Sequence, residues 1–265
     1  MKKNTAWKET VWGGYQKSVI LPNFLRLLSV KKGEVVLDLG CGTGSFSREF
    51  AATGAKVIGV DNSTVLIEAA KKISGASVEY RVASASHLSF IKSGSVDKIA
   101  AILTIQNLDY VDKVFRECAR VLKAGGKMLV VLNHPAFRIP KASGWDWDSL
   151  QSIQYRRVDR YLSESKEKIL MHPSTSSGQV PSTSSRLRQG YGGQAGQGLR
   201  PEEYTISFHR PLQFYFKLFH NSGFCVSRLE EWISNKKSEV GPRSKAEDIA
   251  RKEIPLFLFL ETIKI

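Results

Sequence analysis

Cysteine is scarce in this 265-residue sequence, and long apolar runs are absent. Three cysteines, an odd and low number, exclude a disulfide-stapled fold and favour a reducing compartment. No apolar run approaches the roughly 18 residues of a membrane span, and the longest candidate, 254–260, contains Pro255. No apolar segment follows Met1-Lys2-Lys3-Asn4, as a secretory signal requires. We therefore expect a cytoplasmic protein without a membrane span.

Two signatures of specific chemistry are also missing. The five histidines are isolated, and no His, Cys or acidic cluster has metal-ligand spacing, so we expect no metal site. The glycine-lysine-serine/threonine signature of a phosphate-binding P-loop does not occur. No internal repeat of solenoid length is present. With 42% apolar residues the chain can bury a large core, which excludes a chain that is disordered as a whole.

Basic residues are in clear excess. The chain has 39 Lys and Arg against 25 Asp and Glu, a formal net charge of +14. The first 33 residues hold seven basic side chains and one acid, a pattern that can bind nucleic acid or an anionic surface. These charges alternate with aromatic and leucine side chains and form no block, so a solvated surface is the simpler interpretation.

Short apolar runs alternate with helical patterns, which predicts a parallel sheet with right-handed crossovers. The predicted strands cover 34–39, 56–60, 77–82, 96–103 and 127–132, followed later by 224–233 and 255–265. The predicted helices cover 10–29 with a break near Leu21-Pro22, then 45–53, 64–73, 110–122, 211–220 and 244–252. Gly125-Gly126 is expected to end the helix over 110–122.

Composition divides the chain into four parts. We expect residues 1–32 to form a basic helical cap, 33–140 an α/β core, 141–205 a lid or substrate region, and 206–265 the rest of the same sheet. Within the third part, residues 172–200 repeat Pro-Ser-Thr-Ser-Ser and continue as a Gly- and Gln-rich stretch. Such a composition cannot bury enough apolar surface to offset its ordering entropy, which predicts a disordered insertion in a surface loop.

The most informative segment is V-L-D-L-G-C-G-T-G, residues 36–44. A buried strand leads into a loop with glycine at alternate positions, which permits positive φ and a close approach of backbone to a ligand. The loop opens a helix, whose free N–H groups then lie beside that ligand at the carboxyl end of the sheet. Asp61 ends the next strand 21 residues after Gly40, where its carboxylate can accept hydrogen bonds from two ribose hydroxyls.

The ligand of this loop is not expected to carry a pyrophosphate. The third glycine of the dinucleotide fingerprint is replaced by Ser45. Asp38, on the first strand, would repel a pyrophosphate but would suit an ammonium group. Both observations point away from NAD and ATP.

The glycine segment, followed by G-V-D-N-S over 59–63, resembles the class I S-adenosylmethionine-dependent methyltransferases. More narrowly, the chain is similar to their small-molecule type 11 group, on the strength of N-H-P at 133–135, F-H-R-P-L at 208–212, S-G-F at 222–224 and E-E-W at 230–232. The resemblance implies an α/β fold with a doubly wound, Rossmann-like, seven-stranded and mostly parallel sheet, an antiparallel last strand and helices on both faces. It implies S-adenosylmethionine as cofactor and S-adenosylhomocysteine as product.

The same resemblance assigns the cofactor site. The glycine segment would wrap the methionine and ribose, Asp61 would hold the ribose, and the two following residues would lie beside the adenine. Ser84-Ala85 stands where the group usually has an acid and a small residue near the adenine amine, so we expect a weaker contact there. The full set is Asp38, Gly40, Cys41, Gly42, Gly44, Asp61, Asn62, Ser63, Ser84, Ala85 and Thr104.

Transfer of a methyl group from a sulfonium depends mostly on positioning and needs a general base only for a nucleophile that still holds its proton. His134 and His209 are the candidate bases, although a structural role is the simpler interpretation of each. Arg210 could pair with a substrate carboxylate or anchor a loop, and Trp145 could cover the substrate or pack a lid. Candidate substrate contacts are Tyr15, Asn107, Trp145 and Arg210.

A small-molecule methyl acceptor, with transfer to O, N or C, is the leading hypothesis. No Asn/Asp-Pro-Pro-Tyr follows the fourth predicted strand, and no Thr-Cys or Pro-Cys nucleophile occurs, which disfavours methylation of adenine, glutamine or cytosine. An RNA or protein methyltransferase that uses the basic amino-terminal arm is an alternative. A cofactor-binding protein that has lost catalysis is another, motivated by Ser84 and the insertion. The chain is expected to be a monomer or homodimer.

Overall fold

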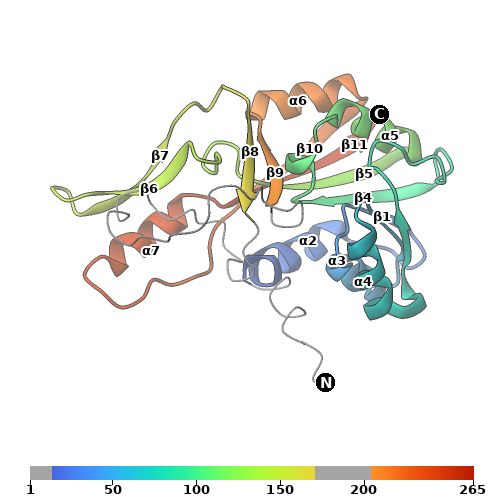
Figure 1. The fold of residues 1–265 in the computed structure, drawn as a ribbon, viewed down its shortest axis with the longest axis horizontal. Coiled ribbons are helices and arrows are strands. Elements are labelled where there is room, and N and C mark those ends of the chain that lie inside the picture. The colour runs from blue at the N-terminus through green and yellow to red at the C-terminus, as the bar shows by residue number, and fades with distance from the viewer. Residues whose placement is uncertain (1–13, 171–203) are drawn as a thin grey trace, which may run out of the picture.

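The computed structural model describes residues 14–170 and 204–265. These residues form a seven-stranded sheet with helices packed on it (Figure 1). The strand order is β10-β11-β5-β4-β1-β2-β3. Every strand runs in the same direction except β11, which is antiparallel to both neighbours. The predicted fold class, with its antiparallel last strand, is confirmed. The strands are β1 Val35–Leu39, β2 Lys56–Asp61, β3 Glu79–Val82, β4 Val96–Ile102, β5 Leu122–Asn133, β10 Phe224–Trp232 and β11 Phe257–Lys264.

Helices cover both faces of the sheet because its central strands are apolar on both faces. In β1, Val36 packs into one core cluster and Leu37 into the other, and both are fully buried. Helices α2 Leu21–Leu28, α3 Ser45–Ala52 and α4 Thr64–Ser74 cover the first face, while α5 Val111–Val121 and α6 Leu212–Asn221 cover the second (Figure 1). Short helical turns lie at η1 Gln16–Ile20, η2 Gly75–Ser77 and η3 Ile105–Asn107, and α7 Ser244–Glu253 contacts β7.

The amino-terminal helix packs into the core. The π-helix η1 runs directly into α2, which has Pro22 in its first turn, so the helix changes type near Leu21-Pro22 and does not break there as predicted. Phe24 stacks on Phe50 with ring centroids 5.6 Å apart and meets the edge of Phe259 at 6.3 Å. The described part of the predicted 1–32 cap is therefore held by the same core as the sheet, while residues 1–13 lie outside the described residues.

The end of α5 differs from the prediction. The helix ends at Val121 and β5 begins at once at Leu122, so Gly125-Gly126 lie inside a strand and do not end the helix. The pairing of β4 with β5 shifts its register between Val96 and Lys98, opposite these glycines. Gly125 has φ +71°, a conformation that glycine adopts without strain.

Two antiparallel strand pairs were not predicted. They are β6 Ser143–Asp148 with β7 Ile153–Val158, and β8 Ser165–Leu170 with β9 Tyr204–His209. The β6–β7 pair is half exposed, so it lacks the buried apolar pattern that marks a strand in sequence. The predicted insertion at 172–200 lies outside the described residues, but Leu170 pairs with Tyr204, so the two chain ends that flank it are adjacent.

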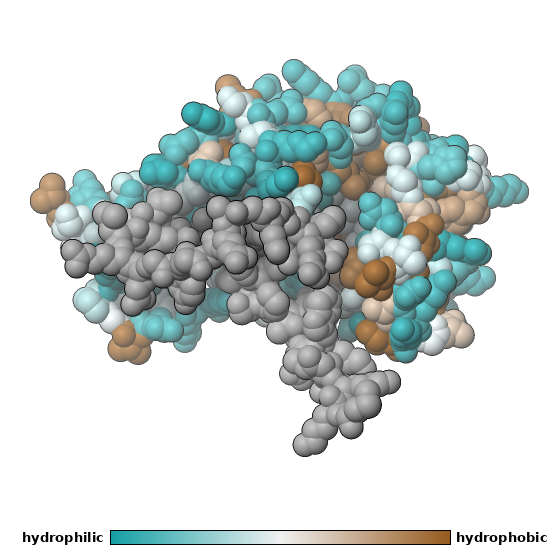
Figure 2. All heavy atoms as spheres, viewed as in Figure 1, coloured by the Kyte–Doolittle hydropathy of each residue, from teal (hydrophilic) through white to brown (hydrophobic). Residues whose placement is uncertain are grey.

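The surface seen in Figure 2 is mostly hydrophilic, with apolar side chains dispersed over it. One apolar spot stands at the left tip, the position of the β6–β7 turn in Figure 1, where Leu150 is exposed. In the described part of the chain, no helix combines the length and apolar character needed to cross a bilayer. The four-part division of the chain proposed from composition remains a prediction.

Phe259 provides a test of this packing. Its ring is fully buried between Phe24 and Trp232. Phe259→Ala should lower the free energy of unfolding by about 3–5 kcal/mol because it leaves a cavity in the core. The exposed Phe90 is the matched control, and Phe90→Ala should cost less than about 1 kcal/mol. Urea unfolding of both variants measures this; equal losses would contradict the assigned core.

Candidate active site

The glycine loop, residues 40–44, joins β1 to α3 at the carboxyl edge of the sheet. Gly40, Gly42 and Gly44 all have positive φ, at 75°, 53° and 72°. A Cβ at Gly40 would lie 2.3 Å from Cγ2 of Thr104, and one at Gly44 would lie 2.0 Å from the Tyr80 hydroxyl. A Cβ at Gly42 would meet no atom within 4 Å. Two of the glycines thus permit close packing, and the central one borders open space.

Asp61 fixes this loop from the neighbouring strand. Its Oδ2 accepts a hydrogen bond from the Gly42 N–H at 3.0 Å, and its Oδ1 accepts one from the Ser63 N–H at 2.9 Å. The Ser63 hydroxyl oxygen then caps α4 by accepting from the Leu66 N–H at 3.3 Å. Each carboxylate oxygen has a further lone pair, so Asp61 can accept more hydrogen bonds from a ligand. Asn62, between these two residues, is exposed.

Asp38 lies buried directly before the loop. Its Oδ2 accepts a hydrogen bond from the Ser47 hydroxyl at 2.5 Å. Burial raises the pKa of the Asp38 carboxyl to about 7; the Ser47 hydrogen bond opposes this shift and the charge of Asp61 adds to it. Burial, with the nearby Asp38, also raises the pKa of the Cys41 thiol far above its usual range. Cys41 therefore stays in the loop as a neutral thiol and does not act as a thiolate nucleophile.

The remaining predicted cofactor residues follow β3 and β4 at the same edge. Thr104 is buried, donates its hydroxyl hydrogen to the Ile102 carbonyl at 3.1 Å, and packs against Gly40. Ser84 is exposed, and its hydroxyl shares a 2.9 Å hydrogen bond with that of Ser86; Ala85 is half-buried. Because β4, β1, β2 and β3 are neighbours in that order, the structure brings the whole predicted set to one edge of the sheet.

The two candidate bases are both buried and already hydrogen-bonded. His134 Nδ1 accepts from the Ala136 N–H at 3.2 Å, so its Nε2–H donates to Glu231 Oε1 at 2.7 Å. Burial lowers the pKa of His134, while Glu231 opposes the shift. The Nε2–H of His209 donates to the Tyr161 carbonyl at 2.7 Å, which leaves Nδ1 as the unprotonated nitrogen of the neutral ring. With both nitrogens engaged, His134 is suited to hold the chain after β5, and His209 keeps one basic nitrogen.

Of the predicted substrate residues, Arg210 and Asn107 lie around the turn after β4. Arg210 donates from Nη2 to the carbonyls of Leu108 at 2.8 Å and Asp109 at 3.2 Å. Asn107 is exposed and donates from Nδ2 to the Leu103 carbonyl at 3.1 Å. Arg210 thus anchors this turn. A loop anchor was one of the two roles expected for Arg210, the other being contact with a substrate carboxylate.

Tyr15 and Trp145 make their contacts away from the glycine loop. The Tyr15 hydroxyl lies 2.9 Å from that of Ser234, and Trp145 packs under the guanidinium of Arg156 at 5.4 Å.

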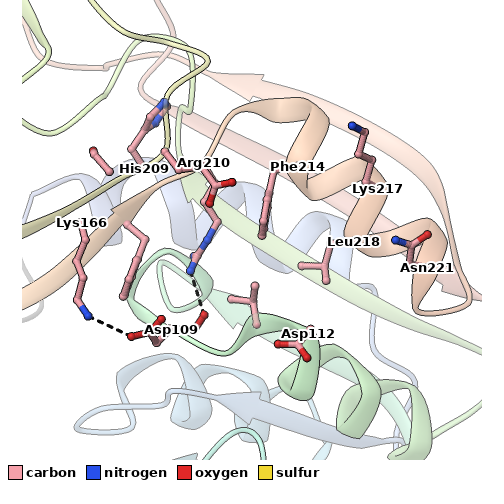
Figure 3. Close-up of a pocket in the computed structure, with 13 residues that line it drawn as sticks. Asp109, Asp112, Lys166, His209, Arg210, Phe214, Lys217, Leu218 and Asn221 are labelled. Atoms are coloured by element: carbon pink, nitrogen blue, oxygen red, sulfur yellow. Dashed lines mark hydrogen bonds and ion pairs between the residues drawn. The ribbon is translucent and has the colours of Figure 1, made fainter.

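Two hollows flank β9. One, of about 660 Å³, lies among α5, α6, β8 and β9, and Figure 3 shows Lys166 and Arg210 reaching across it toward Asp109. No glycine-loop residue lines it. The other is a niche of about 20 Å³ at the ends of β4 and β5, lined by Gln106, Asn133, Pro135, Arg138, Pro140, Ser207, Phe208, His209, Arg210 and Tyr215. Among the described residues, no group of three or more His, Cys, Asp or Glu could hold a metal ion.

Two site residues, Tyr80 and Ser47, were missed in the sequence. Tyr80 supports the loop: its hydroxyl bonds Ser74 at 2.9 Å and donates to the Gly44 carbonyl at 3.4 Å. Ser47 holds Asp38, and the Gln106 Oε1 accepts from the Asn133 N–H at 2.8 Å, tying the ends of β4 and β5. Ser47 falls one helical turn after the glycine loop, a spacing that could have indicated it; Tyr80 left no such signal.

Comparison with known proteins gives a consistent result. Residues 37–130 match the family described as "Methyltransferase domain". Over these residues the chain therefore matches a methyltransferase domain. The match begins on β1 and includes every predicted cofactor residue from Gly40 to Thr104.

Two solved structures share the fold of this methyltransferase domain over most of the chain. A putative S-adenosylmethionine-dependent methyltransferase from Listeria monocytogenes has a TM-score of 0.65 at 21% identity, covering 94% of this chain and 100% of that one. One from Mesorhizobium loti has a TM-score of 0.64 at 22% identity, covering 91% and 96%. A ubiquinone biosynthesis O-methyltransferase from Xanthomonas oryzae is 35% identical over 37% of this chain, which spans 42% of that protein's length.

The glycines of the loop should differ in their tolerance of alanine. Gly42→Ala should cost about 1–2 kcal/mol of unfolding free energy, since only the positive φ is strained. Gly44→Ala should cost about 1–3 kcal/mol more, because its Cβ would collide with the Tyr80 ring. Chemical unfolding of the two variants measures the difference, and a larger loss for Gly42→Ala would refute this geometry.

Asp38 should make ligand-free stability depend on pH. Because its folded pKa is raised to about 7, the folded protein keeps a proton that the unfolded chain loses above about pH 4. The free energy of unfolding should fall by a few kcal/mol, to order of magnitude, as pH rises from about 4 to about 7. Asp38→Asn, permanently neutral and isosteric, should lack this component. Urea unfolding at pH 5 and pH 8 compares the two proteins; parallel pH profiles would disprove it.

Proposed function

We propose that this protein is an S-adenosylmethionine-dependent methyltransferase that acts on a small-molecule acceptor. The observation that carries the proposal is the glycine loop held by Asp61, with Asp38 buried beneath it, at the carboxyl edge of the sheet. A loop of this kind offers backbone N–H groups and a close approach, which is the general means by which parallel sheets bind nucleotide-like ligands.

The chemistry of the loop fits this cofactor. Two carboxylates, Asp38 and Asp61, adjoin the loop, an arrangement that favours a cationic ligand over a pyrophosphate. The open space at Gly42 lets a ligand lie against the backbone. Asp61 keeps lone pairs for ribose hydroxyls, and exposed Asn62 and Ser84 are accessible to an adenine ring. The glycine loop, the two acidic side chains and the accessible polar groups together support S-adenosylmethionine as the cofactor.

When bound, this cofactor supplies an electrophilic methyl group on a sulfonium. The protein's part is then to hold the acceptor in line with it and to exclude water. Thr104 and η3 stand next to Gly40 and are the elements we assign to this boundary between cofactor and acceptor. If the acceptor keeps its proton, the Nδ1 of His209 is better suited to remove it than His134, whose two nitrogens are engaged.

A small acceptor is supported by the relative from Xanthomonas oryzae, named for ubiquinone biosynthesis. The acceptor atom and the oligomeric state, monomer or homodimer, remain predictions. The alternative RNA or protein acceptor rests on the basic arm, much of which lies outside the described residues. A protein that binds the cofactor without methyl transfer is the other alternative, and product formation distinguishes it.

Asp61→Asn tests the cofactor site. The amide cannot accept both backbone hydrogen bonds, and it replaces an acceptor for the ribose with a donor. Calorimetric titration with S-adenosylmethionine should show at least a tenfold weaker affinity than wild type. Asp112→Asn, on the exposed face of α5, is the matched control and should bind as wild type does. Folded wild-type protein that fails to bind would overturn the proposed function.

A further inference from the structure

Two arginines beside the niche of about 20 Å³ have no acidic partner. Arg138 and Arg156 are both partly buried, and within the described residues neither forms an ion pair. The Arg156 side chain donates hydrogen bonds to neutral oxygens, to the Phe137 carbonyl at 2.7 Å and to the Ser143 hydroxyl at 3.0 Å. Arg138 lines the niche. Other arginines of the described chain do form ion pairs, as Arg120 does with Glu117.

The niche around Arg138 is cationic and polar. Its ten lining residues include Arg138 and Arg210 and no Asp or Glu. Amide and hydroxyl groups of Gln106, Asn133 and Ser207 complete the polar part of the wall. Its volume is sufficient for about one water-sized group, such as one oxygen of an anionic head group, and not for a whole molecule.

The electrostatics of the niche favour an anion. Burial lowers the pKa of Arg138, and burial together with the nearby Arg138 lowers that of Arg156 to about 10. The Tyr15 phenol opposes the shift at Arg138. An unpaired cation out of water is unfavourable, and a bound anion would relieve this cost. The planar guanidinium matches a carboxylate or phosphate with two parallel hydrogen bonds.

The niche also lies where an acceptor must be held. Gln106 belongs to η3, which directly follows Thr104, and Thr104 packs against Gly40 of the glycine loop. Gln106 is bonded to Asn133, so the wall of the niche is continuous with the edge of the proposed cofactor site. A head group at Arg138 would therefore anchor a molecule whose other end can reach that edge.

We propose that the methyl acceptor carries an anionic head group, a carboxylate or a phosphate, which Arg138 binds in the niche between the ends of β4, β5 and β9. This inference rests on the proposed function. It adds the chemical class of the acceptor and makes Arg138 its specificity-determining contact.

The test uses nuclear magnetic resonance of the arginine side-chain Nε–Hε groups, recorded on full-length protein saturated with S-adenosylhomocysteine at low salt. The Arg138 signal is identified by its loss in Arg138→Gln. Benzoate, phenyl phosphate and the neutral isostere benzamide are the probes. Benzoate or phenyl phosphate should shift the Arg138 signal saturably, and benzamide should not; the anion that saturates at lower concentration distinguishes carboxylate from phosphate.

Variants make the outcome decisive. Arg138→Gln should weaken binding of the preferred anion at least tenfold, and Arg138→Lys should retain part of it. Arg157→Gln, an exposed arginine on β7 paired with Asp159, should bind the anion as wild type does. S-adenosylhomocysteine affinity, measured in the same samples, should be unchanged in all three.

Equal shifts with benzamide, or an anion affinity unaffected by Arg138→Gln, would overturn the inference while leaving the proposed function intact. Saturable shifts confined to exposed arginines would do the same. Wild-type protein that fails to bind S-adenosylhomocysteine would overturn both.

Discussion

The candidate site depends on the two hydrogen bonds that the Asp61 carboxylate accepts from the backbone. The carboxylate joins the backbone after β1 to the backbone after β2, through Gly42 and Ser63. Glycine gives the loop conformational freedom that these hydrogen bonds restrict, together with those of the Tyr80 hydroxyl to Ser74 and to the Gly44 carbonyl. The parallel register of β1 and β2, which sets Leu39 beside Val60, brings the two loops within reach of one side chain.

Acidic and basic side chains occupy different parts of the carboxyl edge of the sheet. Acidic side chains stand at the carboxyl ends of β1 and β2, at Asp38 and Asp61, and arginines stand around the ends of β4, β5 and β9, at Arg138 and Arg210. Thr104 and η3 lie between the two groups. A cationic cofactor on the acidic side and an anionic acceptor on the basic side would be attracted to adjacent places. The fold thus places the two ligand sites next to each other, and the charge of each site selects the ligand that binds there.

Much of this arrangement could be predicted from sequence because it depends on local patterns. The V-L-D-L-G-C-G-T-G segment contains strand, turn and helix start within nine residues, and the spaced Asp61 marks the neighbouring strand. Contacts between distant parts of the chain could not be predicted in this way. Tyr80 reaches the loop from 36 residues away, and Arg210 reaches Leu108 from 102 residues away. No periodicity encodes such pairs, and the half-exposed strands β6 and β7 carry none of the burial pattern that identifies a strand.

The most direct test of the account is hydrogen–deuterium exchange with and without S-adenosylhomocysteine. The central claim is that this ligand binds between the glycine loop, the Asp61–Ser63 turn and η3. Binding should slow exchange in peptides covering 40–44, 61–64 and 104–107, and leave the β6–β7 pair over 143–158 unchanged. Protection confined to the α5–α6 hollow, or binding with no protection at 40–44, would contradict the claim.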